Sequence, residues 1–394
     1  MMEKFKKAAP ILEKIEQAGF EAYFVGGSVR DYLLNKPIED VDIATSAFPE
    51  EIKQIFPKTF DVGIEHGTVI VVYCGENYEI TTFRTEDEYV DFRRPKEVTF
   101  IRSLEEDLKR RDFTMNAIAM TKDGTLIDPY NGQEDIKDKI ICTVGNAEDR
   151  FNEDALRMMR GVRFVSQLSF TLDKKTYEAI KRLAPLLQHI SIERIYIEFM
   201  KLLKGENRSK ALELIVESNL YQYLPGFAEY SKEINETARI IENKYLNELE
   251  VWAIFLISIE KEPTENFLRK WKMPVKMIRK INQMIQAFKK RETEEWTKEA
   301  IYYTGLDTAL STERIYCAMH EIEVSPRIDK IQQIYNTLPI KHRNELAVNG
   351  NDLMKWVKRN SGPWIRDALE KIEVAVVRGE VRNDKEHIKE WFNS

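Results

Sequence analysis

The sequence predicts an α/β N-terminal part followed by an all-α remainder, and two residue patterns in its 394 residues support this division. Up to about residue 145, short apolar runs typical of strands alternate with helical segments, and glycines separate them. Beyond Val144, glycine becomes sparse and apolar residues recur at steps of three and four, as in the run from Leu156 to Val165. We therefore expect helices almost throughout from that point to the end of the sequence.

Each element of the N-terminal part is predicted from a local signal. The first is an amphipathic helix, because the apolar residues between Phe5 and Ile15 fall at helical spacing. Helices are also expected at 28–34, after a Gly-Gly pair, and at 103–111, where Ser103 can act as the N-cap. Runs of apolar and β-branched residues predict strands at 22–25, 41–44, 68–73, 78–83 and 115–121.

Composition and charge argue against several classes of protein. No apolar run approaches the length of a membrane span, and the first residues form a predicted amphipathic helix rather than a signal peptide. Cys74, Cys142 and Cys317 fit neither a zinc spacing nor a disulfide framework, which favours a reducing cytoplasm. The net charge of −6 argues against non-specific binding to nucleic acid. Residues 269–291, however, carry nine Lys or Arg and no Asp or Glu, so any RNA contact is expected to be local.

Asp40 and Asp42, together with the preceding Gly26 and Gly27, predict a site for a metal ion and a triphosphate. Side chains alternate faces along a strand, so Asp40 and Asp42 point the same way, and two such carboxylates repel each other unless a cation lies between them. Glycines before a helix N-terminus expose backbone N–H groups that suit a phosphate. Glu79 could complete the metal site if its predicted strand lies beside that of Asp42. The alternative for each carboxylate is the polar outer face of a half-buried strand.

Two further groups of residues predict contacts with a nucleotide. Arg110, Arg111 and Asp112 precede a strand-like run, and arginine forks suit phosphate oxygens. The alternative is that these arginines only complement the dipole at a helix C-terminus. Asp154 and Arg157 lie about 60° apart on a predicted helix, so they can present an acceptor and a fork to the Watson–Crick edge of one base. An ordinary intrahelical salt bridge is the alternative for that pair.

Several ordered motifs resemble those of the bacterial class II CCA-adding enzymes, within the tRNA nucleotidyltransferase and poly(A) polymerase family. They run the length of the chain: GGSVRD, DVDIAT, EHGTVIVV, YEITTFRTE, DFRRP, SLEEDLKRRDFTMNAIAM, LIDPYNG and EDALRMMRGVRF. The later strings SIERIYIEFMKLL and LPIKHRNELAVNGNDLM are similar to the neck and tail of the Gram-positive type. Ser28, where many relatives have alanine, and Gly161 are small departures from the pattern.

The resemblance implies a fold and an activity. It implies a polymerase-β-like nucleotidyltransferase head with a small mixed sheet and helices at 1–145. A helical neck at 146–210, a body at 211–305 and a tail at 306–394 would follow in an elongated molecule. The activity would be the stepwise addition of C, C and A to the 3′ end of tRNA from CTP and ATP, without a nucleic-acid template and with release of pyrophosphate. Body and tail would hold the tRNA acceptor arm.

The resemblance also implies the metal and its ligands. Two Mg²⁺ ions held by Asp40 and Asp42, with Glu79 as a third catalytic carboxylate, would activate the 3′-hydroxyl and stabilise the charge that develops on the α-phosphate.

The nucleotide would be bound by residues of three motifs: Gly27, Arg30, Arg111, Asp112, Asp154, Arg157, Arg160 and Arg163. By resemblance, Arg111 contacts the phosphates and Asp112 the ribose. Asp154 and Arg157 would select the base. Arg160 and Arg163 lie progressively further round the helical wheel, so their roles rest on the resemblance alone.

Four alternatives to full CCA addition are considered. A CC-adding enzyme is disfavoured, because it would be expected to lack a competent loop. An A-adding enzyme would keep the same motifs, including the charged segment between Arg84 and Lys96, which matches a loop of enzymes that add the terminal adenosine. A poly(A) polymerase shares the head but usually has a more basic C-terminal part. A catalytically inactive RNA-binding protein is disfavoured by the intact acidic pair and Arg111.

Two further expectations concern single features. His66 is expected to be a turn residue without a catalytic role. A homodimer is compatible with each of these activities.

Overall fold

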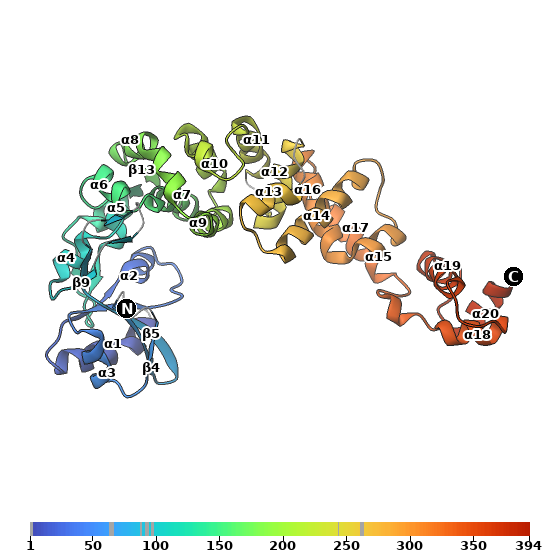
Figure 1. Ribbon diagram of the computed structural model, residues 1–394, viewed down its shortest axis with the longest axis horizontal. Helices are drawn as coiled ribbons and strands as arrows, with labels where there is room; N and C mark the ends of the chain where they lie inside the picture. Colours follow the sequence, from blue (N-terminus) through green and yellow to red (C-terminus); the bar gives the residue numbers. More distant parts are fainter. Residues whose placement is uncertain are drawn as a thin grey trace. The chain divides into compact units, whose positions relative to one another are not determined.

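The computed structural model of the protein describes residues 3–62, 67–86, 89–90, 94–95, 98–242, 244–260 and 264–394. The chain forms two compact units, Met1–Ala238 with Lys270–Lys272 and Arg239–Arg269 with Met273–Ser394 (Figure 1). An α/β head followed by helices is confirmed, because the sheet strands precede residue 145. The predicted boundaries at 145, 210 and 305 concern smaller segments than these units and stay a prediction. In the described ranges, no helix has both the length and the apolar character needed to cross a membrane.

The described part of the first unit contains a seven-stranded mixed sheet in the order β11-β10-β1-β2-β5-β4-β3. Its strands are β1 (Ala22–Val25), β2 (Asp42–Thr45), β3 (Thr59–Asp61), β4 (Thr68–Tyr73), β5 (Glu76–Thr82), β10 (Ala119–Met120) and β11 (Leu126–Ile127). Two-stranded pairs are formed by β6 (Arg84–Glu86) with β9 (Val98–Phe100), β7 (Tyr89–Val90) with β8 (Arg94–Pro95), and β12 (Ile140–Ile141) with β13 (Thr171–Leu172). The strands β2 and β5 are parallel neighbours, and Asp42 lies directly opposite Glu79. This register brings the two predicted acidic strands side by side.

Side-chain alternation along the strands sends apolar residues to both faces of the sheet. The helices next to the sheet are α1 (Glu3–Gln17), α2 (Gly26–Leu33), α3 (Pro49–Ile55) and α4 (Leu104–Lys109). On one face, Phe24 packs against Phe5 of α1, with ring centroids 4.7 Å apart. On the other face, Ala44 joins a buried cluster that includes Leu108 of α4. Asp42 is two residues from Ala44 on the same strand, so it lies on the α4 face of the sheet.

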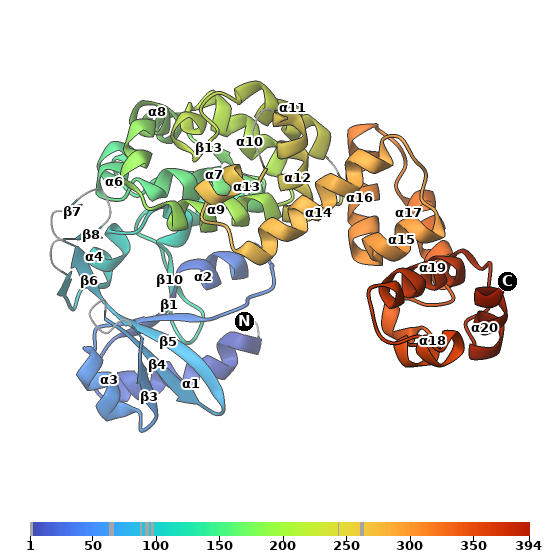
Figure 2. The ribbon, with the colours of Figure 1, turned by 45° about the vertical axis from the view of Figure 1, so that its right-hand side comes forward.

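Helices build the rest of the first unit. They are α5 (Gly132–Asp138), α6 (Ala147–Glu153), α7 (Leu156–Leu168), α8 (Lys174–Leu183), α9 (Ile192–Lys204), α10 (Arg208–Glu217) and α11 (Ser231–Ile241), with 3₁₀ turns at Thr114–Asn116, Ala184–His189 and Leu220–Tyr223. Helices α7 and α9 pack side by side (Figures 1 and 2). Phe199 of α9 contacts the buried ring of Trp271, with centroids 4.7 Å apart. These contacts hold α9 firmly against its neighbours.

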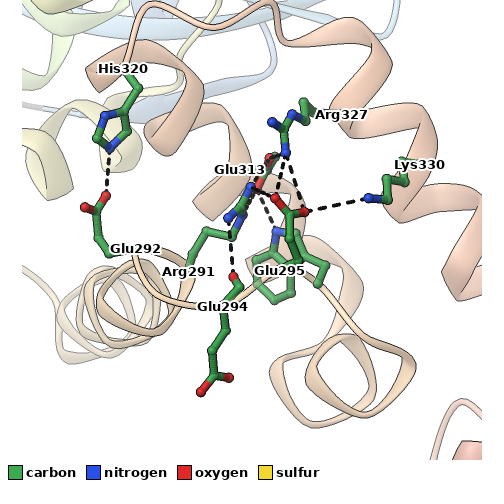
Figure 3. Close-up of polar contacts among 9 residues, drawn as sticks. Arg291, Glu292, Glu294, Glu295, Glu313, His320, Arg327 and Lys330 are labelled. Carbon is green, nitrogen blue, oxygen red and sulfur yellow. Dashed lines mark hydrogen bonds and ion pairs between the residues drawn. The ribbon is translucent and has the colours of Figure 1, made fainter.

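In the described residues of the second unit, all regular secondary-structure elements are helices. Its helices are α12 (Glu248–Ile259), α13 (Thr264–Lys270), α14 (Val275–Arg291), α15 (Lys298–Thr304), α16 (Leu306–Met319), α17 (Ser325–Asn336), α18 (Gly350–Val357), α19 (Trp364–Arg378) and α20 (Lys385–Asn393), with a 3₁₀ turn at Arg343–Glu345. The basic stretch predicted for RNA contact covers α14, but its last residue is turned inward. Arg291 is buried, and its Nε donates to Oε2 of Glu313 at 2.8 Å (Figure 3). The same oxygen accepts from the indole of Trp296 at 2.7 Å, so Arg291 stabilises the fold and is not available to RNA.

Several local predictions were wrong in detail. Residues 115–121 do not form one strand, because the 3₁₀ turn Thr114–Asn116 precedes the two-residue β10. The helix predicted from Ser28 begins at Gly26, so the glycines form its first turn rather than a turn before it. The strand predicted at 41–44 begins at Asp42. Within the region expected to be helical, β13 is a short strand because β12 offers it a parallel partner.

Candidate active site

A pocket of about 780 Å³ in the first unit is lined by residues of β1, β2, β5, α2, α7 and α9. Its charged lining residues are Arg30, Asp42, Glu79, Arg84, Arg110, Arg111, Asp112, Asp154, Arg157, Arg160, Arg163 and Arg194. Every predicted site residue except Asp40 lines this pocket. Eight arginines face four carboxylates in a chain whose net charge is −6. This local positive excess suits a polyanionic ligand.

The N-terminus of α2 reaches the pocket through two glycines. Gly26 has φ +67°, in the left-handed region that favours glycine. A Cβ at Gly26 would meet Nη1 of Arg111 at 3.2 Å and Oδ2 of Asp42 at 3.4 Å, so a side chain there would crowd both groups. No side chain among the described residues caps this end of the helix at Val25. The backbone N–H groups of the first turn are therefore available to an anion.

Asp42 and Glu79 are the pair of opposed carboxylates in the pocket. Within the described residues, neither carboxylate takes part in a hydrogen bond or ion pair. Burial raises the pKa of Asp42 above its ordinary value; the charge of Arg111 opposes this rise, and Glu79 and Asp40 add to it. Asp40 is exposed and precedes β2 rather than lying within it. In the described ranges, no group of three or more His, Cys, Asp or Glu is close enough to hold a metal by itself.

Asp107 fixes the position of Arg111. Its nearly fully buried carboxylate accepts from Nη2 of Arg110 at 2.8 Å and from Nη2 of Arg111 at 3.0 Å. Burial alone would raise the pKa of Asp107, but the two guanidiniums outweigh burial and lower it below its usual value. The Nε of Arg111 is buried and has no hydrogen-bond partner among the described residues. The Nε–H of Arg111 is thus a hydrogen-bond donor that no described group of the protein accepts.

Asp112 is the centre of a buried polar network. It accepts from Nε of Arg160 at 2.7 Å and from the side-chain amide of Asn116 at 3.0 Å. The amide oxygen of Asn116 in turn accepts from Nη1 of Arg30 at 2.8 Å. Burial alone would raise the pKa of Asp112, but Arg160 and the Asn116 amide hold it well below its usual value. The network therefore keeps Asp112 ionised and fixes Arg30 and Arg160 on the pocket wall.

Three arginines surround the ring of Phe164 on one wall of the pocket. The Cζ atoms of Arg30, Arg160 and Arg163 lie 5.1, 5.8 and 4.0 Å from its centroid. Arg163 also approaches Glu198, with Nε and Oε2 3.1 Å apart, although these two atoms lack hydrogen-bond geometry. Burial and the neighbouring Arg160 lower the pKa of Arg163 to about 10. The side chain stays charged at neutral pH, so this wall is positive.

The prediction that Asp154 and Arg157 share a helix was wrong. Helix α6 ends at Glu153, Asp154 is extended (φ −138°, ψ 102°), and α7 begins at Leu156. Asp154 accepts the Leu156 N–H, and such local bonds of aspartate compete with helix formation. Asp154 is not held in place by a helix that it shares with Arg157. It is held by the guanidinium of Arg194 on α9, whose Nη2 lies 2.6 Å from Oδ2 of Asp154.

Arg157 is fixed separately from Asp154. The side chain is buried and forms an ion pair with Glu153 of α6, so the alternative of an intrahelical salt bridge between Asp154 and Arg157 is also wrong. It also donates to the backbone carbonyls of Arg110 at 2.9 Å and Arg150 at 3.1 Å. Asp154 and Arg157 therefore line the same pocket, and each is held in place by different residues.

Sequence reasoning missed three residues that organise the pocket. Asp107 could have been found, because it precedes two arginines by three and four residues on a predicted helix. Asn116 stands in the motif string RRDFTMNA but carries no local sign that it bridges two other side chains. Arg194 stands in SIERIY, and nothing in the sequence connects it with Asp154, forty residues earlier.

Two predictions fall on residues outside those described. His66 is one of them, since 63–66 are not described. The charged segment between Arg84 and Lys96 is the other, because 87–88, 91–93 and 96–97 are not described. The expectations for both stay predictions.

Known families match successive parts of the chain. A family described as "Poly A polymerase head domain" matches residues 22–142, and one described as "Probable RNA and SrmB-binding site of polymerase A" matches 169–231. A family of tRNA nucleotidyltransferase domain 2 matches 244–392.

Individual relatives match over the full length. The CCA-adding enzymes of Bacillus cereus (strain Q1) and Bacillus anthracis (strain CDC 684 / NRRL 3495) are each 51% identical over 391 residues, which cover 99% of this chain and 98% of theirs. The crystal structure of the Bacillus stearothermophilus CCA-adding enzyme in complex with CTP is 48% identical, with a TM-score of 0.92 and coverage of 100% and 98%. A Thermotoga maritima CCA-adding enzyme complexed with tRNA_CCA, at 20% identity, 100% and 96% coverage and a TM-score of 0.66, shares the fold.

Proposed function

The chain belongs to the CCA-adding enzymes, which are tRNA nucleotidyltransferases, and we propose that its arginine-rich pocket is where each nucleotide is joined to tRNA. The enzyme adds C, C and A to the 3′ end of tRNA from CTP and ATP. One observation carries the location of the site: a glycine-led helix N-terminus, two opposed carboxylates without partners in the described ranges, and an excess of arginines line the same pocket. These features suit the phosphates and the metal of a nucleoside triphosphate.

In the proposed reaction, the tRNA 3′-hydroxyl attacks the α-phosphate, a new P–O bond forms, and the bond to pyrophosphate breaks. The N–H groups of Gly26 and Gly27 and the guanidinium of Arg111 would hold the triphosphate oxygens. Asp107 keeps Arg111 in place before the substrate arrives. Donors fixed in advance stabilise developing charge without having to reorganise during the reaction.

Divalent metal use follows from the family, and two Mg²⁺ ions are part of the proposal. Asp42 and Glu79, with the nearby Asp40, would hold them, because unpaired carboxylate oxygens are the hard donors that Mg²⁺ prefers. When bound, the metal supplies activation of the hydroxyl and neutralisation of charge on the phosphates. The two carboxylates would orient the substrates through the metal. Neither would bring a positively charged side chain of the protein into the site with it.

Base selection is proposed for Asp154 and Arg157. Cytosine and adenine each carry an amino group beside a ring nitrogen on the Watson–Crick edge, so a carboxylate can accept from one and a guanidinium can donate to the other. Uracil has a carbonyl where cytosine has the amino group, and guanine has one where adenine has it. Two fixed side chains of the protein would thereby act in place of a nucleic-acid template.

The tRNA is proposed to meet the exposed basic side of α14. Lys276, Arg279 and Lys280 are exposed there, and in the described ranges none of them forms an ion pair. Unpaired cations are the ones that can release phosphate counterions when RNA binds. A cytoplasmic location is proposed with this partner, since tRNA processing and three unpaired cysteines are both consistent with that compartment.

One assay tests the activity against its alternatives. The enzyme is incubated with tRNA that lacks its terminal CCA, with CTP, ATP and Mg²⁺, and the product lengths are measured. We expect growth by three nucleotides that stops there. An A-adding enzyme would extend only tRNA that already ends in CC, and a poly(A) polymerase would give long tails from ATP alone. Either result would contradict full CCA addition.

A further inference from the structure

Arg291, the last residue of α14, directs its side chain into the second unit rather than toward solvent. All three nitrogens of its guanidinium donate within the protein (Figure 3). Nε and Nη2 form a fork on the carboxylate of Glu313 at 2.8 and 3.3 Å, Nη2 also donates to Glu295 at 3.2 Å, and Nη1 donates to the carbonyl of Glu294 at 3.3 Å. The guanidinium also lies over the ring of Tyr316, with Cζ 4.1 Å from the centroid. Both the edge and the face of this cation are therefore fixed.

This cluster joins the end of α14 to two other helices of the same unit. Glu313 lies on α16, its side chain is 1% exposed, and it also accepts from the indole of Trp296 at 2.7 Å. Arg327 lies on α17 and approaches Glu295 at 3.1 Å and Glu313 at 3.9 Å. Lys330, one turn further along α17, pairs with Glu295 at 3.7 Å. The last turn of α14 is thus held by charged contacts to α16 and α17.

A buried ion pair of this kind acts on geometry more than on stability. Removing two charges from water costs free energy that their attraction largely only offsets, so replacing a buried pair by well-packed uncharged side chains is often neutral or stabilising. An arginine fork, by contrast, fixes the distance and the angle between two groups, which an apolar contact does not. The fork from Arg291 to Glu313 therefore sets the angle at which α14 meets α16.

The angle of α14 matters because its exposed cations lie near both ends of the helix. In the described ranges these cations form no ion pair: Lys276, Arg279, Lys280, Lys289 and Lys290. A helix of 17 residues is about 25 Å long, so the cations at its two ends meet different phosphates of one RNA. We propose that Arg291 is a positioning residue for tRNA binding, whose fork to Glu313 holds α14 at the angle that lets both ends reach the RNA together. This inference rests on the proposed contact of α14 with tRNA.

The test combines Arg291→Met with Glu313→Gln, which removes both charges of the fork and leaves neither buried without its partner. The introduced amide oxygen can still accept from Trp296, so the melting temperature should stay close to that of wild type. The Kd for tRNA should rise about tenfold at physiological salt, because each of two lost phosphate contacts lowers the salt slope by about 0.7–0.9. The KM for CTP should not change, since the nucleotide pocket lies in the first unit.

Two further variants separate the fork from charge alone. Arg291→Lys keeps the charge but has no planar fork, so it should also weaken tRNA binding. Arg378→Met with Glu299→Gln is the matched control, because this pair joins α19 to α15 at 2.7 Å in the same unit and neither residue lies on α14. The control loses the same two charges and should bind tRNA as wild type does.

Three results would overturn the positioning role of Arg291. They are wild-type tRNA affinity in the double variant at Arg291 and Glu313, an equal loss of affinity in the control, and a fall of more than about 5 °C in the melting temperature of the double variant, which would mean that the fork acts on stability. Failure of the proposed function gives a different result. Wild-type tRNA affinity after reversal of Lys276, Arg279 and Lys280 to glutamate would refute the contact of α14 with tRNA, whatever the fork does.

Discussion

Replacing Asp42 by asparagine should abolish nucleotide addition without destabilising the protein. The substitution keeps the shape of the side chain and removes its charge. In the described ranges, the Asp42 carboxylate forms no hydrogen bond or ion pair, so the amide loses no contact. Its register partner on β5 is Glu79, another carboxylate. Removing one of two opposed like charges therefore relieves repulsion.

The expected size of the effect follows from that arrangement. Like charges directly opposite each other on paired strands destabilise by about 0.2–1 kcal/mol. Burial of the Asp42 carboxylate adds to this cost, and the nearby charge of Arg111 reduces it. We expect Asp42→Asn to raise the free energy of unfolding by up to about 1 kcal/mol, or about 2–4 °C in the melting temperature of a unit of this size. Functional sites commonly trade stability for activity in this way.

The assay combines calorimetry with turnover. Without metal, Asp42→Asn should melt at or above the wild-type temperature. With Mg²⁺ at ten times its Kd, wild type should gain about 1.4 kcal/mol of stability, and the variant should gain much less. Turnover should fall by several orders of magnitude, because loss of a ligated metal costs several kcal/mol of transition-state stabilisation.

Asp61→Asn is the matched control. Asp61 lies on β3 of the same sheet but pairs with Lys53 at 2.7 Å and does not line the pocket. Its substitution should leave turnover unchanged and lower stability by at most about 1 kcal/mol. The reasoning about Asp42 would be refuted by wild-type turnover in Asp42→Asn, by an undiminished response to Mg²⁺, or by a loss of stability above about 2 kcal/mol.

Further predictions concern nucleotide and tRNA binding. Arg157→Ala should admit UTP or GTP by weakening discrimination about 1–3 kcal/mol, and unchanged ratios of kcat/KM would contradict its role at the base. Asp107→Asn should raise the KM for CTP and destabilise the protein by about 3 kcal/mol, because two guanidiniums lose a nearly fully buried partner; a wild-type melting temperature would contradict this. Reversing Lys276, Arg279 and Lys280 to glutamate should weaken tRNA binding and flatten its salt dependence, with each lost phosphate contact lowering the slope by about 0.7–0.9. Equal affinity for CTP in this variant is the internal control, and unchanged tRNA affinity would place the RNA elsewhere.

The type of most elements could be predicted from the sequence, because periodicity and turn residues act locally. The spacing from Phe5 to Ile15 gave a helix whose apolar side is fully buried. The apolar run at 22–25 gave β1, and the motif strings indicated that their residues share one site. Element ends were less predictable, as the first turn of α2 at Gly26 shows, because an end depends on which groups satisfy the terminal backbone.

The partners of the charged side chains were decided only by the tertiary structure. Asp154 pairs with Arg194 across forty residues, and Asn116, which lies eighty-six residues after Arg30, bridges that arginine to Asp112. Arg291 ends a basic stretch that reads as exposed, yet it is buried against Glu313. Long arginine side chains can pair with any carboxylate that packing brings within reach, so helical or strand spacing does not fix their partners. The sequence alone determined which chemical groups this enzyme carries; the packing of α7 against α9, and of the sheet against α4, determined which of them are held in place and which are left for the substrates.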